Sequence, residues 1–287
     1  MNTSISIIIP TYNRKEMLLY TLDSVLRQTN PNWYCIVVDD HSVDDTKSVV
    51  EDYVKKDTRF SYLINERAKG AQGARNTGIL HAESEWVLLL DSDNKIAEDY
   101  VEEILKKIES DPKPDIVTNY IKVEYEVPQE EEETQCYKTE GNILKALLSG
   151  KTYVDNSSAC IRRQKLLDIG LLDEDCPSYQ EWDTHIRLAK DSVYSYVPQC
   201  LTIYKEHKGD RISSHTKGVW ANGLYVLKKH RQFWLAEVGE DIYSHFLLEI
   251  LEKSKSFSLG NRLRVKSIVF SLCPKLLKQL LKIQIRR

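Results

Sequence analysis

The stretch that decides the fold is WVLLLDSDN, residues 86–94. Its apolar run is short and bounded by polar residues, which predicts a strand buried on both faces of a sheet. Asp91 and Asp93 follow this strand, and side chains two positions apart in an extended segment point to the same side. Because like charges repel, the pair needs a cation or deep hydration. The stretch therefore predicts a site for Mg²⁺ or Mn²⁺ shared with a phosphate, or else a solvated turn, in which Asp, Ser and Asn are common.

The chain around this stretch alternates between apolar strands and amphipathic helices. Strands are expected at residues 5–9, 33–38, 60–64, 115–127, 155–161, 193–197 and 201–204, and helices at residues 16–28, 44–54, 70–81, 99–108, 140–148, 165–169 and 178–189. This alternation predicts an α/β fold in which a mostly parallel, Rossmann-like sheet is flanked by helices on both faces. From residue 219 onward the pattern is helical, so we expect a domain at residues 1–215 and a helical extension at residues 216–287.

Polar residues follow several of the expected strands directly. These residues are Thr11, Asn13 and Arg14 after the first strand, Asp39 and Asp40 after the second, and Asp91 and Asp93 after the strand at residues 86–90. In open parallel sheets, ligands bind beyond the carboxyl ends of the strands. We therefore expect these polar groups to converge on one crevice, which makes a solvated turn the weaker explanation of the Asp91–Asp93 pair.

Composition and charge exclude several classes of protein. The 287 residues can bury a sizeable core, and the net charge of −3 argues against general nucleic-acid binding. Six cysteines are scattered without metal-type spacing, as expected for reduced thiols in a cytosolic protein. The chain runs from Met1 straight into a strand, and no apolar stretch has the length of a membrane span, so we expect neither a signal peptide nor a spanning helix.

The last part of the chain is strongly basic. No acidic residue follows Glu252, whereas ten lysines and arginines do, and apolar residues alternate with the cations between residues 262 and 285. One interpretation is a basic amphipathic helix that binds an anionic membrane, which would place a cytoplasmic protein at the inner face of the plasma membrane, near a lipid-linked glycan. The other is a helix packed on the domain with its lysines in water.

Four segments resemble the family 2 inverting glycosyltransferases. They are IIIPTYNR at 7–14, VVDD at 37–40, GARNTG at 73–78 and LLDSD at 89–93, in this order. The resemblance covers roughly residues 4–215. It implies the nucleotide-diphospho-sugar transferase fold called GT-A, and metal-dependent transfer of a sugar from a nucleotide diphosphate, most often UDP, to a hydroxyl of a glycan or lipid-linked glycan. Such chemistry belongs to surface polysaccharide or glycolipid synthesis.

The resemblance also assigns residues to the donor site. It implies nucleotide contacts from Pro10, Thr11, Tyr12, Arg14, Asp40, Arg75, Asp91 and Ser92. A carboxylate such as Asp40 can accept the uracil N3–H, and Tyr12 can stack on the base. Asp93 would bind Mn²⁺ or Mg²⁺ directly, with Asp91 on the ribose or the metal's water shell. His207 stands where many relatives carry a histidine near the diphosphate and the metal.

A downstream acidic segment matches the position of the family's catalytic base. Where the family commonly has a Glu-Asp pair, this chain has Gln180-Glu181, so Glu181 takes the place of the base. Asp183 matches a second frequent acidic position and is the second candidate. Its alternative role is to support the helix N-terminus, where negative charge is favoured.

Two other functions remain to be weighed. A nucleotidyltransferase would need a glycine-rich, basic loop after the first strand, whereas residues 11–14 read TYNR. A non-catalytic nucleotide-sugar-binding protein would bind its ligand without transferring the sugar. The presence of Asp91, Asp93 and Glu181 favours an enzyme.

Overall fold

The computed structural model describes residues 3–110, 114–125, 133–206 and 216–276. Its chain divides into two compact units. The first comprises Met1–Leu144, Thr152–Glu174 and Thr184–Lys208, and the second comprises Lys145–Lys151, Asp175–Asp183 and Gly209–Arg287. The second unit therefore contains two short segments from within residues 1–215 as well as the C-terminal helices.

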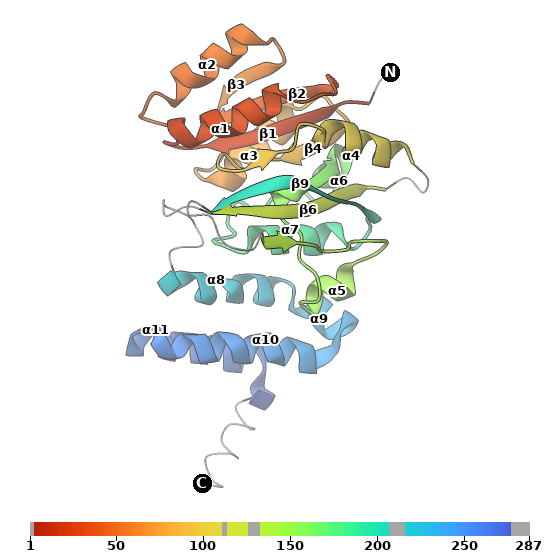
Figure 1. Cartoon of the computed structure of the whole chain (residues 1–287). Helices are drawn as coiled ribbons and strands as arrows, with labels where there is room; N and C mark the ends of the chain where they lie inside the picture. Colours follow the sequence, from red (N-terminus) through yellow and green to blue (C-terminus); the bar gives the residue numbers. More distant parts are fainter. Residues whose placement is uncertain (1–2, 111–113, 126–132, 207–215, 277–287) are drawn as a thin grey trace. The chain divides into compact units, whose positions relative to one another are not determined.

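The first unit is built on one sheet, whose described strands number nine (Figure 1). Their order is β3-β2-β1-β4-β8-β6-β9-β5, and β7 pairs with β6. The strands are β1 Ile5–Thr11, β2 Trp33–Asp39, β3 Phe60–Ile64, β4 Trp86–Leu89, β5 Lys95–Ile96, β6 Ile116–Tyr125, β7 Glu133–Gln135, β8 Ala159–Arg162 and β9 Tyr194–Glu206.

The two halves of this sheet differ in strand direction. Strands β3, β2, β1 and β4 are all parallel, as the alternating pattern predicts. In the other half β8 runs antiparallel to both β4 and β6, and β5 runs antiparallel to β9, while β6 and β9 are parallel. The predicted α/β fold is confirmed, and its parallel half carries the polar strand ends.

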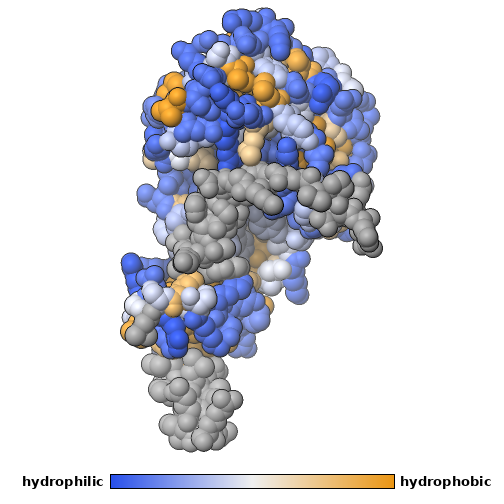
Figure 2. Space-filling model, turned by 60° about the vertical axis from the view of Figure 1, so that its left-hand side comes forward, coloured by the Kyte–Doolittle hydropathy of each residue, from blue (hydrophilic) through white to orange (hydrophobic). Residues whose placement is uncertain are grey.

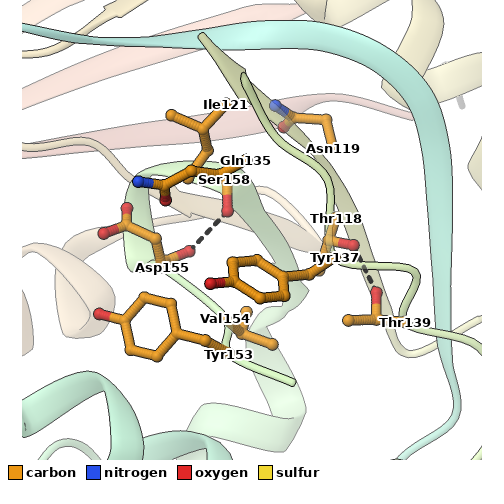
Figure 3. A pocket seen from close by; sticks show the side chains of 10 residues that line it. All are labelled: Thr118, Asn119, Ile121, Gln135, Tyr137, Thr139, Tyr153, Val154, Asp155 and Ser158. Atoms are coloured by element: carbon orange, nitrogen blue, oxygen red, sulfur yellow. Dashed lines mark hydrogen bonds between the residues drawn. The ribbon is translucent and has the colours of Figure 1, made fainter. Parts of the chain in front are cut away.

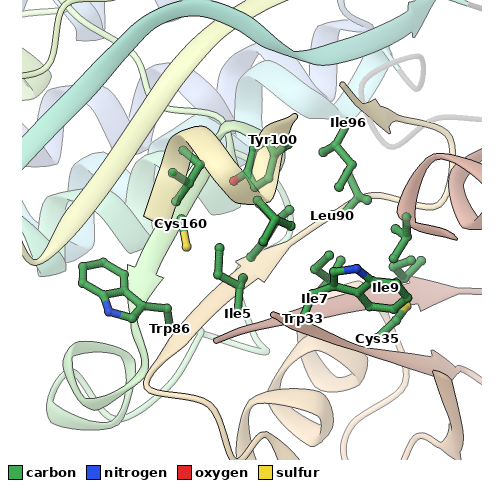
Figure 4. Close-up of a cluster of buried hydrophobic side chains, with 14 of the residues drawn as sticks. Ile5, Ile7, Ile9, Trp33, Cys35, Trp86, Leu90, Ile96, Tyr100 and Cys160 are labelled. Carbon is green, nitrogen blue, oxygen red and sulfur yellow. The ribbon is translucent and has the colours of Figure 1, made fainter. Parts of the chain in front are cut away.

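Helices cover both faces of the parallel half. The helices of the first unit are α1 Lys15–Leu26, α2 Thr46–Lys56, α3 Ala71–His81, α4 Tyr100–Glu109 and α6 Arg163–Asp168. Apolar side chains of α1, α2 and α4 join Ile5, Ile7 and Ile9 of β1 in one buried cluster. Figure 4 shows these three isoleucines and Tyr100 of α4. On the opposite face α3 packs very close to the sheet, and Gly78 permits this approach. A Cβ atom at Gly78 would lie only 2.4 Å from Cγ2 of Ile8.

Three elements differ from the sequence prediction for local physical reasons. The helix expected at residues 140–148 is only α5 Leu144–Leu148, because Gly141 has a positive φ of 70° and pairs with Tyr194 in a β-bridge. The strand expected at residues 155–161 starts only at Ala159, because the Asp155 side chain caps a 3₁₀ turn, η1 Asn156–Ser158. The segments expected at residues 193–197 and 201–204 form one strand, β9.

The second unit is helical, as expected for the C-terminal region. Its helices are α8 Thr216–Lys229, α9 Arg231–Glu237, α10 Gly239–Lys253 and α11 Leu259–Leu272, with a 3₁₀ turn, η3 Ser254–Ser256, before α11. Two tryptophans join the inserted segments to these helices. The indole N–H of Trp182 donates to the Leu147 carbonyl and that of Trp234 to the Leu148 carbonyl, and the two rings meet edge to face at 5.1 Å.

The described part of the basic tail packs within its own unit. In α11, Val265, Val269 and Leu272 are buried, and the helix contacts α10 and α8. Residues 277–287, the rest of the predicted amphipathic segment, lie outside the described residues. None of the described helices is long and apolar enough to span a membrane. On the face drawn in Figure 2, the coloured residues form small apolar areas separated by hydrophilic ones.

Candidate active site

The carboxyl ends of β1, β2 and β4 lie together, because β1 pairs with both neighbours. Backbone hydrogen bonds continue this arrangement past the strands: Asp40 N–H donates to Thr11 O at 2.8 Å, and Leu90 N–H donates to Ile8 O at 2.9 Å. The polar residues that follow the three strands are therefore brought to one edge of the sheet, as the sequence predicts.

Asp91 and Asp93 sit in a turn rather than in an extended segment. The turn is closed by Asn94 N–H, which donates to Asp91 O at 3.1 Å. The Ser157 hydroxyl holds it from the side, because it accepts the Asp91 N–H at 3.2 Å and the Asn94 side-chain amide at 3.0 Å. Ser92 is buried inside the turn. Ser157 carries no sequence signal, because it lies 66 residues downstream of Asp91.

Each carboxylate of this turn is paired with an arginine. Arg14 Nη1 lies 2.6 Å from Asp93 Oδ2, and Arg75 Nη2 lies 2.5 Å from Asp91 Oδ1. Gln72 orients the Arg75 guanidinium by accepting from its Nη1 at 2.7 Å. The positive charge that the two carboxylates need is thus supplied by the protein. Asp91 and Asp93 keep 31% and 14% of their side-chain surface exposed, so ligand groups can reach them.

The two acidic residues after β2 have different surroundings. Asp39 is engaged in the fold, since its carboxylate accepts from the Ser42 N–H and from the Tyr62 hydroxyl. Burial, together with the Asp39 carboxylate, raises the pKa of Tyr62 above its usual range.

Asp40 accepts from the Asn65 side-chain amide at 2.7 Å and from the Gly70 N–H at 2.8 Å, one bond to each oxygen. Because a carboxylate oxygen has two lone pairs, Asp40 can still accept from a ligand. Asn65 and Gly70, which hold it, were not among the residues expected from the sequence.

Residues at the end of β1 combine exposed and buried polar groups. The Tyr12 ring is 43% exposed, and the ammonium group of Lys69 lies 4.6 Å from the ring centroid, a cation–π contact. Pro10 and Thr11 are buried. No described residue hydrogen-bonds to the Thr11 hydroxyl oxygen. A buried hydroxyl without a partner costs free energy, which a ligand hydroxyl or amide would recover.

The two acidic residues proposed from the α7 segment are placed differently. Helix α7 spans Gln180–Leu188, and its first turn, through Asp183, belongs to the second unit. Glu181 is partly exposed. Asp183 is 1% exposed, and its Oδ1 lies 2.7 Å from both His230 Nε2 and Lys229 Nζ. Both contacts come from side chains of its own unit, a lysine and a histidine. The sequence pattern did not reveal them.

The described residues could supply only some of the ligands of a metal ion, and a bound substrate and water would have to supply the others. No three His, Cys, Asp or Glu side chains of the described ranges form a cluster that could hold a metal ion. His207 lies outside the described residues. Asp93 offers one hard oxygen ligand, and a divalent cation there would take the rest from a diphosphate and water, as Mg²⁺ commonly does.

Comparisons with known proteins agree with the fold. The model of the family "Glycosyl transferase family 2" matches residues 6–170, so the chain belongs to glycosyl transferase family 2. Its sheet and helices form the GT-A fold. The chain resembles the crystal structure of Staphylococcus aureus TarS residues 1–349 in complex with UDP-GlcNAc, with a TM-score of 0.65, 23% identity, and coverage of 96% of this chain and 78% of that chain.

Two curated relatives extend the sequence comparison. Glycosyltransferase GlyA of Streptococcus pneumoniae serotype 4 is 29% identical over 280 residues, which are 91% of this chain and 38% of GlyA. WfgD of Escherichia coli, a UDP-Glc:alpha-D-GlcNAc-diphosphoundecaprenol beta-1,3-glucosyltransferase, is 43% identical over 90 residues, which are 31% of this chain and 35% of WfgD. The alignments thus span little more than a third of the length of these relatives.

Proposed function

We propose that this chain transfers a sugar from a UDP-sugar to a hydroxyl of a glycan, with inversion at the anomeric carbon, in the synthesis of a surface polysaccharide or glycolipid. The observation that carries the proposal is the cluster at the ends of β1, β2 and β4, where Arg14 pairs with Asp93, Arg75 pairs with Asp91, and Asp40 follows the neighbouring strand. Carboxylates recognise base and ribose, and arginines recognise phosphate.

Each strand end has its own part in donor binding. Tyr12 stacks on the uracil after Lys69 leaves its ring, and Asp40 accepts the uracil N3–H. Asp91 accepts from a ribose hydroxyl. Arg14 and Arg75 change partner from carboxylate to diphosphate, which keeps their charge compensated. Asp93 and His207 would hold a Mn²⁺ or Mg²⁺ ion, whose charge would offset the negative charge on the leaving diphosphate.

Glu181 is the general base of this proposal. The acceptor oxygen attacks the anomeric carbon, its proton passes to the Glu181 carboxylate, and the bond from that carbon to the diphosphate breaks. One in-line displacement inverts the configuration, so no covalent nucleophile is needed. Asp183 is the weaker candidate, because a carboxylate that is 1% exposed and paired with His230 and Lys229 is closed to an acceptor. Its proposed role is to hold the first turn of α7.

A lipid-linked acceptor is the substrate class that we favour. The name of WfgD specifies a diphosphoundecaprenol acceptor and a UDP-glucose donor. We infer a cytoplasmic site of action, with residues 277–287, which include Lys278, Lys282, Arg286 and Arg287, attracting the chain to anionic lipid. Deleting residues 277–287 should abolish co-sedimentation with phosphatidylglycerol vesicles, and unchanged binding would contradict this part of the proposal.

A thermal-shift panel of UDP- and GDP-sugars, with and without Mn²⁺, tests donor binding. We expect a UDP-sugar to raise the melting temperature, and more so with Mn²⁺, whereas Asp40→Asn should weaken the shift. Detection of free UDP with an acceptor glycan would then separate a transferase from a non-catalytic binder. Release of pyrophosphate from UTP and a sugar phosphate would instead identify a nucleotidyltransferase, and indifference to every nucleotide sugar would refute the proposal.

A further inference from the structure

A hollow in the first unit is lined by residues that have no part in donor binding as proposed above. It is lined by the middle of β6, the end of β7 and the segment before η1, with Thr118, Gln135, Tyr137, Tyr153, Asp155 and Ser158 among its residues (Figure 3). The enclosed part has room for about one water molecule. A larger ligand would therefore lie against the rim.

Two tyrosine rings form that rim. Tyr137 and Tyr153 are 40% and 37% exposed, and their ring centroids lie 6.2 Å apart at an interplanar angle of 66°. The rings come from segments on either side of α5, so the fold brings together two amphipathic surfaces that the sequence keeps apart. Tyrosine offers an apolar ring face and a hydroxyl at once, which suits the apolar C–H face and the hydroxyls of a sugar ring.

Polar groups stand beside the rings. Figure 3 shows the Gln135 amide and the Asp155 carboxylate on the same side of the hollow as the hydroxyl ends of the two tyrosines. Asp155 Oδ1 already accepts the Ser157 N–H at 2.8 Å, which fixes the direction of the carboxylate. A carboxylate and an amide next to aromatic rings can bond to neighbouring hydroxyls of one sugar, as in ligand sites where few polar groups orient an apolar contact.

The hollow is linked to the Asp91–Asp93 turn by η1. Asp155 precedes this 3₁₀ turn, and Ser157 within it bonds to Asp91 and Asn94. A ligand on the tyrosine rims is thus only one short turn away from the carboxylates proposed to bind the donor. Because those carboxylates are assigned to the UDP moiety in the proposed function, a sugar ring on the rim is assigned to the other substrate.

We propose that Tyr137, Tyr153 and Asp155 form a subsite for a sugar ring of the acceptor glycan. The inference rests on the proposed glycosyltransferase function and names the acceptor's chemistry: a pyranose with neighbouring equatorial hydroxyls for the carboxylate and an apolar face for the rings.

Saturation-transfer NMR tests this subsite. The probes are free glucose, galactose and N-acetylglucosamine at millimolar concentration, each with the full chain saturated with UDP. At least one sugar should show saturation transfer, and Tyr137→Ala and Tyr153→Ala should each weaken its affinity at least about tenfold. Asp155→Asn, which keeps the oxygen that accepts from Ser157, should weaken it too. Tyr34→Ala removes a more exposed tyrosine of β2, 54% exposed, and should leave sugar binding unchanged.

The outcomes separate the two proposals. If the wild-type chain does not bind UDP, the proposed function is refuted, whatever saturation transfer the sugars show. Two results, each with UDP binding retained, would overturn the acceptor subsite alone. One is that the wild-type chain transfers saturation to none of the sugars. The other is that Tyr137→Ala and Tyr153→Ala bind the sugar as tightly as the wild type. If the two variants weaken UDP-sugar binding rather than binding of free sugar, the hollow holds the donor sugar and the acceptor assignment is wrong.

Discussion

Two pairs of acidic residues in this chain have the same spacing and opposite surroundings. Asp91 and Asp93 share a turn in which each carboxylate is partly exposed and paired with an arginine. Glu181 and Asp183 lie on a helix, where residues two apart point about 200° from each other. Glu181 is therefore partly exposed while Asp183 is buried against His230 and Lys229. The backbone between two carboxylates, not their spacing, decides whether they share one ligand or divide into two roles.

The largest expected effect is on activity, and it comes from Glu181, the partly exposed residue of the pair on α7. Glu181→Gln removes the proposed base and should lower sugar transfer about 10²–10⁴-fold, measured as UDP release with acceptor. The melting-temperature shift with UDP should stay as in the wild type. Glu249→Gln, an exposed charge change on α10, serves as the control. Wild-type turnover in Glu181→Gln would remove the distinction between Glu181 and Asp183.

Replacing Asp183, the buried residue of the pair, should instead lower the free energy of unfolding. Asp183→Ala leaves His230 and Lys229 without their carboxylate, and loss of one partner of a buried ion pair costs about 3–5 kcal/mol. Urea unfolding measures this change. Glu249→Ala breaks an exposed carboxylate–histidine pair of the same unit, 3.3 Å long, and should cost less than about 1 kcal/mol. Similar losses in the two variants would show that Asp183 is not a buried anchor.

A third measurement sharpens the comparison farther along α7. Burial lowers the pKa of His185 to about 3, so this side chain is neutral in the folded protein at pH 7, and it takes up a proton on unfolding only below about pH 6.5. Because its folded pKa lies below its unfolded pKa of about 6.5, the stability that it contributes is present above pH 6.5 and is lost as the pH falls toward 3.

Between pH 7 and pH 5 the free energy of unfolding should drop by about 2 kcal/mol from this group. Urea unfolding of His185→Gln should show a shallower drop over that range, while His245→Gln, at an exposed position of α10, should follow the wild type. Parallel curves for the wild type and His185→Gln would mean that His185 is not held neutral by the fold.

The smallest effect on stability is expected for the partly exposed pair of Arg14 and Asp93. Arg14→Ala breaks the contact to Asp93, whose partners are 29% and 14% exposed, and should cost less than about 1 kcal/mol in urea unfolding. It should nevertheless weaken UDP-dependent thermal stabilisation, because the arginine is needed again by the diphosphate. A loss of several kcal/mol, with UDP binding intact, would make Arg14–Asp93 a structural pair like that of Asp183.

The parallel half of the fold could be predicted from the sequence, because each buried strand is an unbroken apolar run followed by polar residues. The same pattern predicted that Arg14, Asp40, Asp91 and Asp93 lie at one edge of the sheet, since parallel strands end there.

What the sequence did not reveal depends on contacts between distant segments. Ser157 supports the Asp91–Asp93 turn across 66 residues, and His230 lies 47 residues beyond Asp183. Two predicted elements began too early because a local contact competed with the periodic pattern: the strand expected from residue 155, where the Asp155 side chain caps a 3₁₀ turn, and the helix expected from residue 140, where Gly141 has a positive φ.

The makeup of the second unit has a consequence for how the chain is synthesised. Asp183 and the first turn of α7 emerge from the ribosome well before Lys229 and His230, which compensate the Asp183 charge. Until those residues follow, Asp183 lacks its contacts to Lys229 and His230. Nascent chains should therefore form the strand ends proposed to bind the nucleotide early, and the turn that carries the proposed base only near completion. An exchange of C-terminal helices between relatives would likewise have to carry residues 145–151 and 175–183 with it.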